Sequence, residues 1–125
     1  MATVRPEERR RFSRVPYQSP AQLLIGTRSF VCGVHDVSLK GVLLDSPGPG
    51  RAKLGQPCRV VIDLGGGGEV IQLQGTVAHV EAGTVGVRCT GIDLEGLSRL
   101  RRLLELNLGD EALLHRELGA LVRSH

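Results

Sequence analysis

The sequence predicts a mainly β fold: a six-stranded antiparallel β-barrel with C-terminal helices and a flexible basic N-terminal arm. Residues 20–92 contain short runs rich in Val and Ile, separated by Gly, Pro, Ser and Asp, which is typical of antiparallel strands joined by tight turns. Leucines recur at helical spacing within residues 93–123. Residues 1–19 are polar, charged and interrupted by prolines, and they indicate an arm rather than a helix or strand. These three segments form a single domain.

Length and composition fit one soluble globular domain. The chain has 125 residues, of which 41% are hydrophobic and 23% charged, so it can bury one core. Two Phe, one Tyr and no Trp leave Val, Leu and Ile to build that core. No apolar run approaches the roughly 18 residues of a membrane span, and the polar start has no apolar signal core. The sequence therefore predicts a cytoplasmic protein that does not enter a membrane.

The basic charge of the chain is concentrated in the arm. Residues 1–14 contain five arginines, no lysine and two glutamates, and so carry the whole net charge of +3. This asymmetry favours an anionic partner that is bound by the N-terminus. The alternative is a solvated, disordered tail.

Six runs are predicted strands, and they lie near residues 21–27, 30–37, 41–46, 57–64, 69–80 and 84–90. The Ser-Pro-Gly-Pro-Gly segment at 46–50 is a loop by composition. The glycines at 65–68 lack the Gly-Lys-Ser/Thr ending of a phosphate-binding loop and precede a strand, so they indicate a hairpin connection. Closely spaced strands with no helix between them favour an antiparallel barrel or sandwich.

Two helices are expected after the strands. The apolar face of the first consists of Leu94, Leu97, Leu100, Leu103, Leu104 and Leu108. Asp93 can cap this helix, because its carboxylate accepts the free N–H groups of the first turn. Gly109 suits a C-terminal cap, and Asp110 with Glu111 can open a second helix. The second helix is expected to bury Leu114, Leu118, Leu121 and Val122.

The residue types that serve metals and catalysis do not form a recognisable site. Cys32, Cys58 and Cys89 are far apart, and the chain has no Cys-x-x-Cys or Cys/His cluster, so we expect buried thiols and no metal. His35 and Asp36, with a nearby serine, are the residue types of a hydrolase triad. However, neighbours on a strand point to opposite faces, so His35 cannot be oriented by Asp36. We therefore expect the protein not to be an enzyme.

Two motifs carry the functional signal. Arg10 and Arg14 form an Arg-x-x-x-Arg on the arm, a weak signal alone because arginine is abundant in this chain. Asp36, Ser38 and Gly41 form an Asp-x-Ser-x-x-Gly at a turn between two predicted strands. At average residue usage, the second motif occurs by chance in only about a few per cent of chains of this length. The order of the motifs and their separation by one strand strengthen the signal.

In this order the motifs resemble those of the PilZ domain, the bacterial receptor module for cyclic di-GMP. The segments ERRRFSRVP, HDVSLKGVLL and VGVRCTGID also resemble the family pattern, and the similarity extends over about residues 7–122. The tail LRRLLELNLGDEALLHREL resembles a subgroup of stand-alone, single-domain adaptors. The resemblance implies a six-stranded barrel with a C-terminal helix, in agreement with the strand and helix patterns.

The resemblance also implies a ligand site. Cyclic di-GMP carries two phosphates and two guanines, and an arginine can bind a phosphate or the guanine O6/N7 edge bidentately. The Asp36 carboxylate can accept the donors of a guanine Watson–Crick edge, and Ser38 can offer a hydroxyl. Gly41 can supply a backbone conformation that other residues resist. The alternative for Asp36 and Ser38 is turn chemistry, with the side chains bonded to their own backbone.

Further contacts are expected beside the two motifs. An arginine at the position of Arg9 goes, in this family, with two intercalated ligand molecules, so two per chain are expected. Arg11 belongs to the same basic run and is expected to contact the ligand. His79 occupies a place where relatives can carry an aromatic ring, and we expect it to stack near a guanine. The alternative for His79 is a half-exposed strand histidine. No cofactor is expected.

The hypothesis is therefore a cyclic di-GMP receptor and adaptor. The ligand would order residues 1–14 over the barrel, and the new surface would regulate a partner protein in motility, chemotaxis or biofilm control. Resemblance to the adaptor subgroup suggests a chemotaxis-receptor methyltransferase as that partner. The alternative is a small β-barrel that binds nucleic acid through its basic arm, which the lack of stacking aromatics on the strands disfavours. A PilZ scaffold used only for protein contacts would usually lack the motif arginines.

Overall fold

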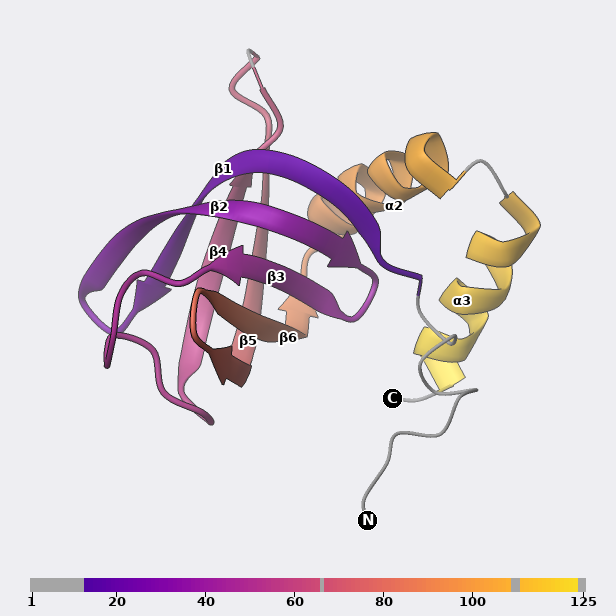
Figure 1. The fold of residues 1–125 in the computed structure, drawn as a ribbon. Helices are drawn as coiled ribbons and strands as arrows, with labels where there is room; N and C mark the ends of the chain where they lie inside the picture. Colours follow the sequence, from indigo (N-terminus) through magenta and orange to yellow (C-terminus); the bar gives the residue numbers. More distant parts are fainter. Residues whose placement is uncertain (1–12, 66, 109–110, 124–125) are drawn as a thin grey trace.

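Six strands and two helices make up the described part of the chain (Figure 1). The structure is a computed structural model and describes residues 13–65, 67–108 and 111–123. The strands are β1 (Val15–Ile25), β2 (Arg28–Ser38), β3 (Gly41–Asp45), β4 (Pro57–Asp63), β5 (Val70–Glu81) and β6 (Thr84–Ile92). The helices are α2 (Leu94–Leu108) and α3 (Glu111–Arg123). The predicted mainly β fold with two C-terminal helices is confirmed.

The strands form one closed antiparallel barrel in the order β1-β2-β3-β6-β5-β4. Hairpins connect most neighbours along the chain, but two pairings join strands that are distant in sequence. β1 pairs with β4 from Ala21↔Ile62 to Leu24↔Arg59, and β3 pairs with β6 through the whole length of β3. The β3–β6 pairing places the turn between β2 and β3 next to β6, and this is where the candidate site lies.

The core lies inside the barrel and under α2. Inward-facing Val, Leu and Ile alternate with exposed residues along the strands, as in β4, where Cys58, Val60 and Ile62 are buried. The fully buried large side chains are Leu23, Leu44, Ile62, Ile71, Leu104 and Leu114, with Val37, Val42, Val60, Val77 and Val85. Each such side chain contributes roughly 1.5–3 kcal/mol by leaving water. Aliphatic side chains thus provide the core that the composition indicated.

β1 begins at Val15, earlier than the expected start near residue 21. Residues 15–19, which the sequence pattern assigned to the arm, therefore belong to the barrel. Pro16 and Pro20 caused the difference, because proline normally argues against a strand. Both prolines pair only with β2, since the pairing of β1 with β4 starts at Ala21. Proline is tolerated where a strand has a neighbour on one side only.

The two helices form where expected, but Leu94, which the sequence pattern placed on the apolar face of the first, is exposed in the first turn of α2. The Asp93 carboxylate accepts a hydrogen bond from the Gly96 N–H at 2.6 Å and so caps α2, as predicted. In α3, Leu114 is buried and Leu118 is partly buried against the core. The proposed cap residues Gly109 and Asp110, and the side chains of Leu121 and Val122, lie outside the described residues. Within the described ranges, neither helix has the length and apolar character to span a bilayer.

The three cysteines are unpaired thiols, and their burial raises the pKa of each. Cys32 and Cys58 are buried, as expected, whereas Cys89 is only partly covered. Burial raises the pKa of the Cys58 thiol to about 11. The raised pKa values favour the protonated, unreactive form at neutral pH. Among the described residues, no group of His, Cys, Asp and Glu has the arrangement of a metal site.

The Cys58 thiol is expected to make stability fall as the pH rises above its ordinary pKa of 9.0. Between pH 9.0 and about 11 the folded protein keeps the Cys58 proton that the unfolded chain loses, so the free energy of unfolding decreases with pH. Urea denaturation at several pH values in this range measures the slope. Cys58→Ala should reduce this slope, while the raised pKa values of Cys32 and Cys89 contribute equally in both proteins. Equal slopes would contradict the burial of this thiol.

Candidate functional site

Arg14 and Asp36, one from each motif, contact each other directly. Arg14 Nε donates a hydrogen bond to Asp36 Oδ1 at 2.9 Å. Arg14 immediately precedes β1, and Asp36 lies in β2 opposite Pro16. The side chains are 54% and 21% exposed, respectively, so a ligand can reach both. A surface pair of this kind contributes at most about 1 kcal/mol to stability, so the barrel does not depend on it.

A bulge in β2 turns both His35 and Asp36 toward the outer surface. β2 has one extra residue relative to β3 at this point. Val34 and Val37 are both buried, so the two residues between them face outward. The expectation that His35 and Asp36 point to opposite faces is therefore wrong. His35 Nε2 pairs with Asp45 Oδ1 on β3, and Asp36 pairs with the arginine before β1.

The turn between β2 and β3 holds Ser38, Lys40 and Gly41 against β6. Ser38 is buried, and its Oγ accepts a hydrogen bond from the Lys40 N–H at 3.1 Å. This contact is the turn chemistry that formed the alternative interpretation of Ser38. The hydroxyl can still donate a hydrogen bond. The Lys40 carbonyl accepts from the Cys89 N–H at 2.6 Å, so the turn is fastened to β6.

Gly41 is required by the close approach of β3 and β6. It is absent from the glycines with a positive φ, so the expectation of an unusual backbone conformation is wrong. A Cβ at Gly41 would lie 2.0 Å from the carbonyl oxygen of Val87 and 3.1 Å from the Cα of Arg88. Real Cβ atoms do not approach a carbonyl oxygen so closely. The missing side chain thus lets β6 bring Arg88 directly opposite Gly41.

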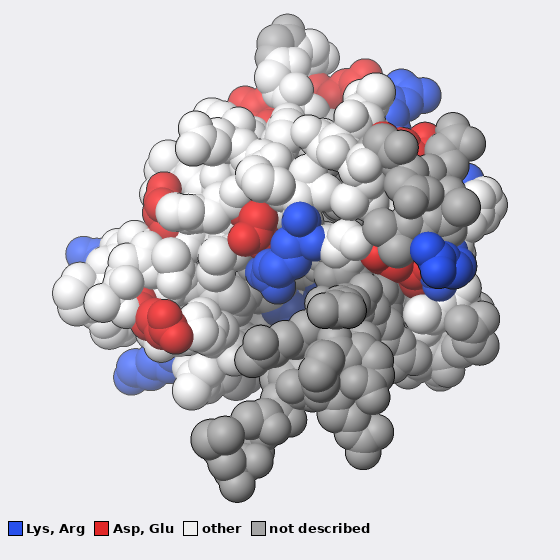
Figure 2. Space-filling model, turned by 45° about the vertical axis from the view of Figure 1, so that its right-hand side comes forward, with Lys and Arg blue, Asp and Glu red and all other residues white. Residues whose placement is uncertain are grey.

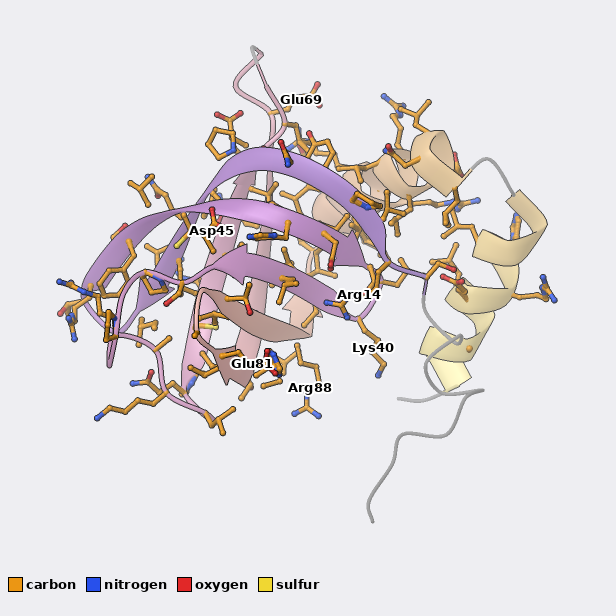
Figure 3. The ribbon with its side chains drawn as sticks, in the orientation of Figure 1. Arg14, Lys40, Asp45, Glu69, Glu81 and Arg88 are labelled. Carbon is orange, nitrogen blue, oxygen red and sulfur yellow. The ribbon has the colours of Figure 1, made fainter. Side chains whose placement is uncertain are left out.

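The turn, β3, β5 and β6 surround a surface pocket of about 430 Å³. This volume is within the range of small-molecule sites. Arg14, Lys40 and Arg88 line the pocket, and Figure 3 shows all three on the same side of the barrel. No Asp or Glu is among the described lining residues. With Asp36 bonded to Arg14, the cations at the pocket still outnumber the carboxylates, and Figure 2 shows Lys and Arg atoms near the centre of the view with an acidic group directly beside them.

A second bulge brings His79 to the pocket. β5 has an extra residue between Val77 and His79 relative to β6, so Ala78 and His79 both line the pocket although Val77 is buried. His79 lies over Gly86, where a Cβ would come within 2.9 Å of the His79 Cβ. His79 Nε2 lies 3.2 Å from Glu81 Oε1, and its side chain is 48% exposed. The ring is thus half-exposed at the pocket wall.

The structure brings most of the described candidate residues together. Those that line the pocket are Arg14, Ser38, Gly41 and His79, with Asp36 bonded to Arg14. Arg9, Arg10 and Arg11 lie outside the described residues. Their contacts with the ligand therefore stay predictions from the sequence.

The sequence pattern missed Lys40 and Arg88 as pocket residues. Lys40 stands inside the second motif, at a position that the motif leaves open. Arg88 is exposed and follows the buried Val87 in the alternation of β6, so the pattern could place it on the outer surface. Only the β3–β6 register shows that it faces the turn.

The protein is thus a small closed β-barrel domain. Its pocket, beside the Arg14–Asp36 pair, is suited to an anionic ligand. The chain belongs to the PilZ domain family, which matches residues 8–106. The matched residues include both motifs and every strand of the barrel. The family that the motifs indicated is thereby confirmed.

Solved PilZ structures share the fold at low sequence identity. The PilZ domain of YcgR from Escherichia coli with c-di-GMP has a TM-score of 0.66 and 14% identity, covering 94% of this chain and 99% of that chain. The PilZ domain of CeSA from a cellulose-synthesizing bacterium has a TM-score of 0.60 and 18% identity, covering 78% of this chain and 96% of that chain. The Bacillus subtilis inhibitor of motility, MotI (DgrA), has a TM-score of 0.60 and 12% identity, covering 99% of this chain but only 54% of that one.

Proposed function

We propose that the pocket binds cyclic di-GMP and that the chain is a receptor that regulates a partner protein. The observation that carries the proposal is the charge of the pocket, which Arg14, Lys40 and Arg88 line without a carboxylate among its described lining residues. A dinucleotide with two phosphates has the complementary charge. PilZ domains are cyclic di-GMP receptor domains and generally not enzymes. The YcgR domain, solved with c-di-GMP, supports the choice of ligand.

Asp36 and Arg14 provide the recognition of guanine in this proposal. The ionised Asp36 carboxylate only accepts hydrogen bonds, which suits the N–H donors of a guanine Watson–Crick edge. Arg14 contacts Asp36 through Nε, and its two terminal nitrogens can reach a phosphate or the guanine O6/N7 edge. The pair therefore presents acceptors and donors side by side before the ligand arrives.

The arm completes the proposed site. Arg9, Arg10 and Arg11 would add guanidinium groups from the chain that leads into Arg14, and Arg9 would permit two intercalated ligand molecules. The ligand shifts the arm only by binding its ordered form more tightly than its free form. Ser13 and Arg14 are already held by Glu117 and Asp36 without ligand. The part of the arm before them would be ordered by the ligand and would then act on a partner in motility, chemotaxis or biofilm control. The shared fold with an inhibitor of motility supports a motility partner.

Binding of fluorescent cyclic di-GMP to Asp36→Ala, at about 50 and 200 mM salt, tests the proposal. Asp45→Ala is the matched control, because Asp45 is an exposed strand carboxylate that pairs with His35. We expect Asp36→Ala to weaken binding at least about tenfold, Asp45→Ala to leave it unchanged, and salt to have a modest effect. A nucleic-acid-binding barrel would ignore Asp36 and lose affinity steeply with salt. That result would overturn the proposal.

His79→Ala is expected to weaken cyclic di-GMP binding about tenfold, because stacking of a base on a ring contributes roughly 1–3 kcal/mol. The ring already lies at the pocket wall, so the substitution removes a contact surface without opening the core. His115→Ala, on the exposed side of α3, is the control. Fluorescence polarisation gives both dissociation constants. Unchanged affinity in His79→Ala would show an ordinary strand histidine.

A further inference from the structure

A buried carboxylate of α3 holds the residue immediately before Arg14. Glu117 is only 2% exposed. Its Oε1 accepts a hydrogen bond from the Ser13 backbone N–H at 2.9 Å, and its Oε2 accepts one from the Ser13 hydroxyl at 2.5 Å. Both carboxylate oxygens are thus used by one residue that lies 104 positions away in sequence. Figure 1 shows α3 on the side of the barrel from which β1 starts.

These contacts matter because a buried carboxylate is costly unless its oxygens are hydrogen-bonded. The two donors of Ser13 compensate that cost, and hydrogen bonds to a charged acceptor are stronger than neutral ones. α3 otherwise packs mainly against α2, with Leu114 buried in the core and Leu118 partly buried against it. The Glu117–Ser13 contact is therefore a specific attachment between α3 and the start of the barrel.

Arg14 lies between two fixed points of the chain. On one side Ser13 is held by Glu117, and on the other Val15 is paired with Val37 in the β1–β2 ladder. The backbone of Arg14 is thus held from both sides, while its side chain contacts Asp36 and lines the pocket. Without the Ser13–Glu117 hydrogen bonds, only the pairing of Val15 with Val37 would still fix the backbone next to Arg14. Arg14 would then sample many orientations, and a ligand would have to order it.

We infer that Glu117 is a positioning residue for Arg14, so that α3 is part of the ligand site although it does not line the pocket. The inference rests on the proposed function for its effect on cyclic di-GMP, but the positioning itself is a property of the ligand-free protein. The Ser13–Glu117 contact thereby links the ligand site with α3. Because coupling between two sites is reciprocal, a partner that pulls α3 away weakens ligand binding, and the ligand in turn stabilises α3 in place.

Glu117→Gln tests this inference with two measurements. Nuclear magnetic resonance of the ligand-free protein reports whether the Arg14 Nε–H remains hydrogen-bonded and protected from exchange. Titration with cyclic di-GMP gives the dissociation constant. We expect the Arg14 signal to lose its protection and the dissociation constant to rise about five- to tenfold. Ser13→Ala, which removes only the hydroxyl donor, should give a smaller change of the same kind, and the double variant should add little to Glu117→Gln.

The control is Glu105→Gln, which removes a helix carboxylate that bonds the Arg101 side chain at 3.1 Å on α2. Both measurements should match the unsubstituted protein. If Glu117→Gln unfolds the protein, the same two measurements on Ser13→Ala test the inference. Protection of the Arg14 signal in both variants would overturn the inference. A protein that fails to bind cyclic di-GMP would overturn the proposed function, and the ligand-free signal would still decide the role of Glu117.

Discussion

Arg14→Ala is expected to weaken cyclic di-GMP binding at least about 100-fold and to leave the barrel folded. Arg14 is the arginine of the first motif that the described residues include, and its guanidinium lines the pocket and contacts Asp36. Charge-assisted hydrogen bonds contribute about 1.5–3 kcal/mol each, so losing two of them reaches this factor. The substitution also leaves Asp36 without its partner, which makes the site less attractive to a phosphate. The fold survives because the pair is solvent-exposed.

Calorimetric titration of Arg14→Ala measures this loss, and Arg28→Ala provides a matched control. Arg28 lies over the Phe30 ring at 5.1 Å and does not line the pocket. Its replacement should change neither the dissociation constant nor the heat of binding. The dissociation constant of Arg14→Lys should lie between those of the unsubstituted protein and Arg14→Ala, because a lysine keeps the charge but loses the planar pair of donors. Wild-type affinity in Arg14→Ala would refute a role of the first motif in binding.

Gly41→Ala is expected to destabilise the protein by at least about 3 kcal/mol. The added Cβ would lie 2.0 Å from the Val87 carbonyl oxygen, which belongs to the backbone of β6 and cannot rotate away. Relief requires β3 and β6 to separate, which breaks the ladder that closes the barrel on this side. The same separation moves Arg88 from the pocket, so remaining folded protein should also bind the ligand weakly.

Urea denaturation of Gly41→Ala and Gly67→Ala measures this cost against a control. A Cβ on Gly67 has no atom within 4 Å and the residue needs no left-handed backbone, so its replacement should change stability by less than about 0.5 kcal/mol. If Gly41→Ala were as stable as Gly67→Ala, the close approach of β3 and β6 would be incorrect. The requirement for glycine at residue 41 would then have to come from contacts with the ligand.

Much of the fold could be predicted from the sequence because it depends on local patterns. Alternating Val and Ile indicated the strands, and leucines with the Asp93 cap indicated α2. The start of β1 was missed, because Pro16 and Pro20 are compatible with a strand only where β1 lacks a second neighbour. Which strands close the barrel depends on packing between distant segments. No local pattern encodes that pairing.

The candidate site could be predicted only in part, because local spacing identifies some of its residues and packing between distant segments adds the others. Its motif residues are identifiable by spacing, whereas Arg88 joins them only through the β3–β6 register. The bulges in β2 and β5 turn Asp36 and His79 outward against the simple alternation, and a single sequence does not show where a bulge falls. Glu117 could not be connected with the site, because its partner Ser13 lies at the other end of the chain.

The most direct test of the proposed function is isothermal titration of the full chain with cyclic di-GMP. A receptor with this pocket should give saturable heat, and the arginine run of the arm should give two ligand molecules per chain. Saturation at one equivalent would keep the receptor and remove the role proposed for Arg9. Titration without heat, and without a shift in thermal stability at high ligand concentration, would contradict the account. The cationic pocket would then have to bind a different anion.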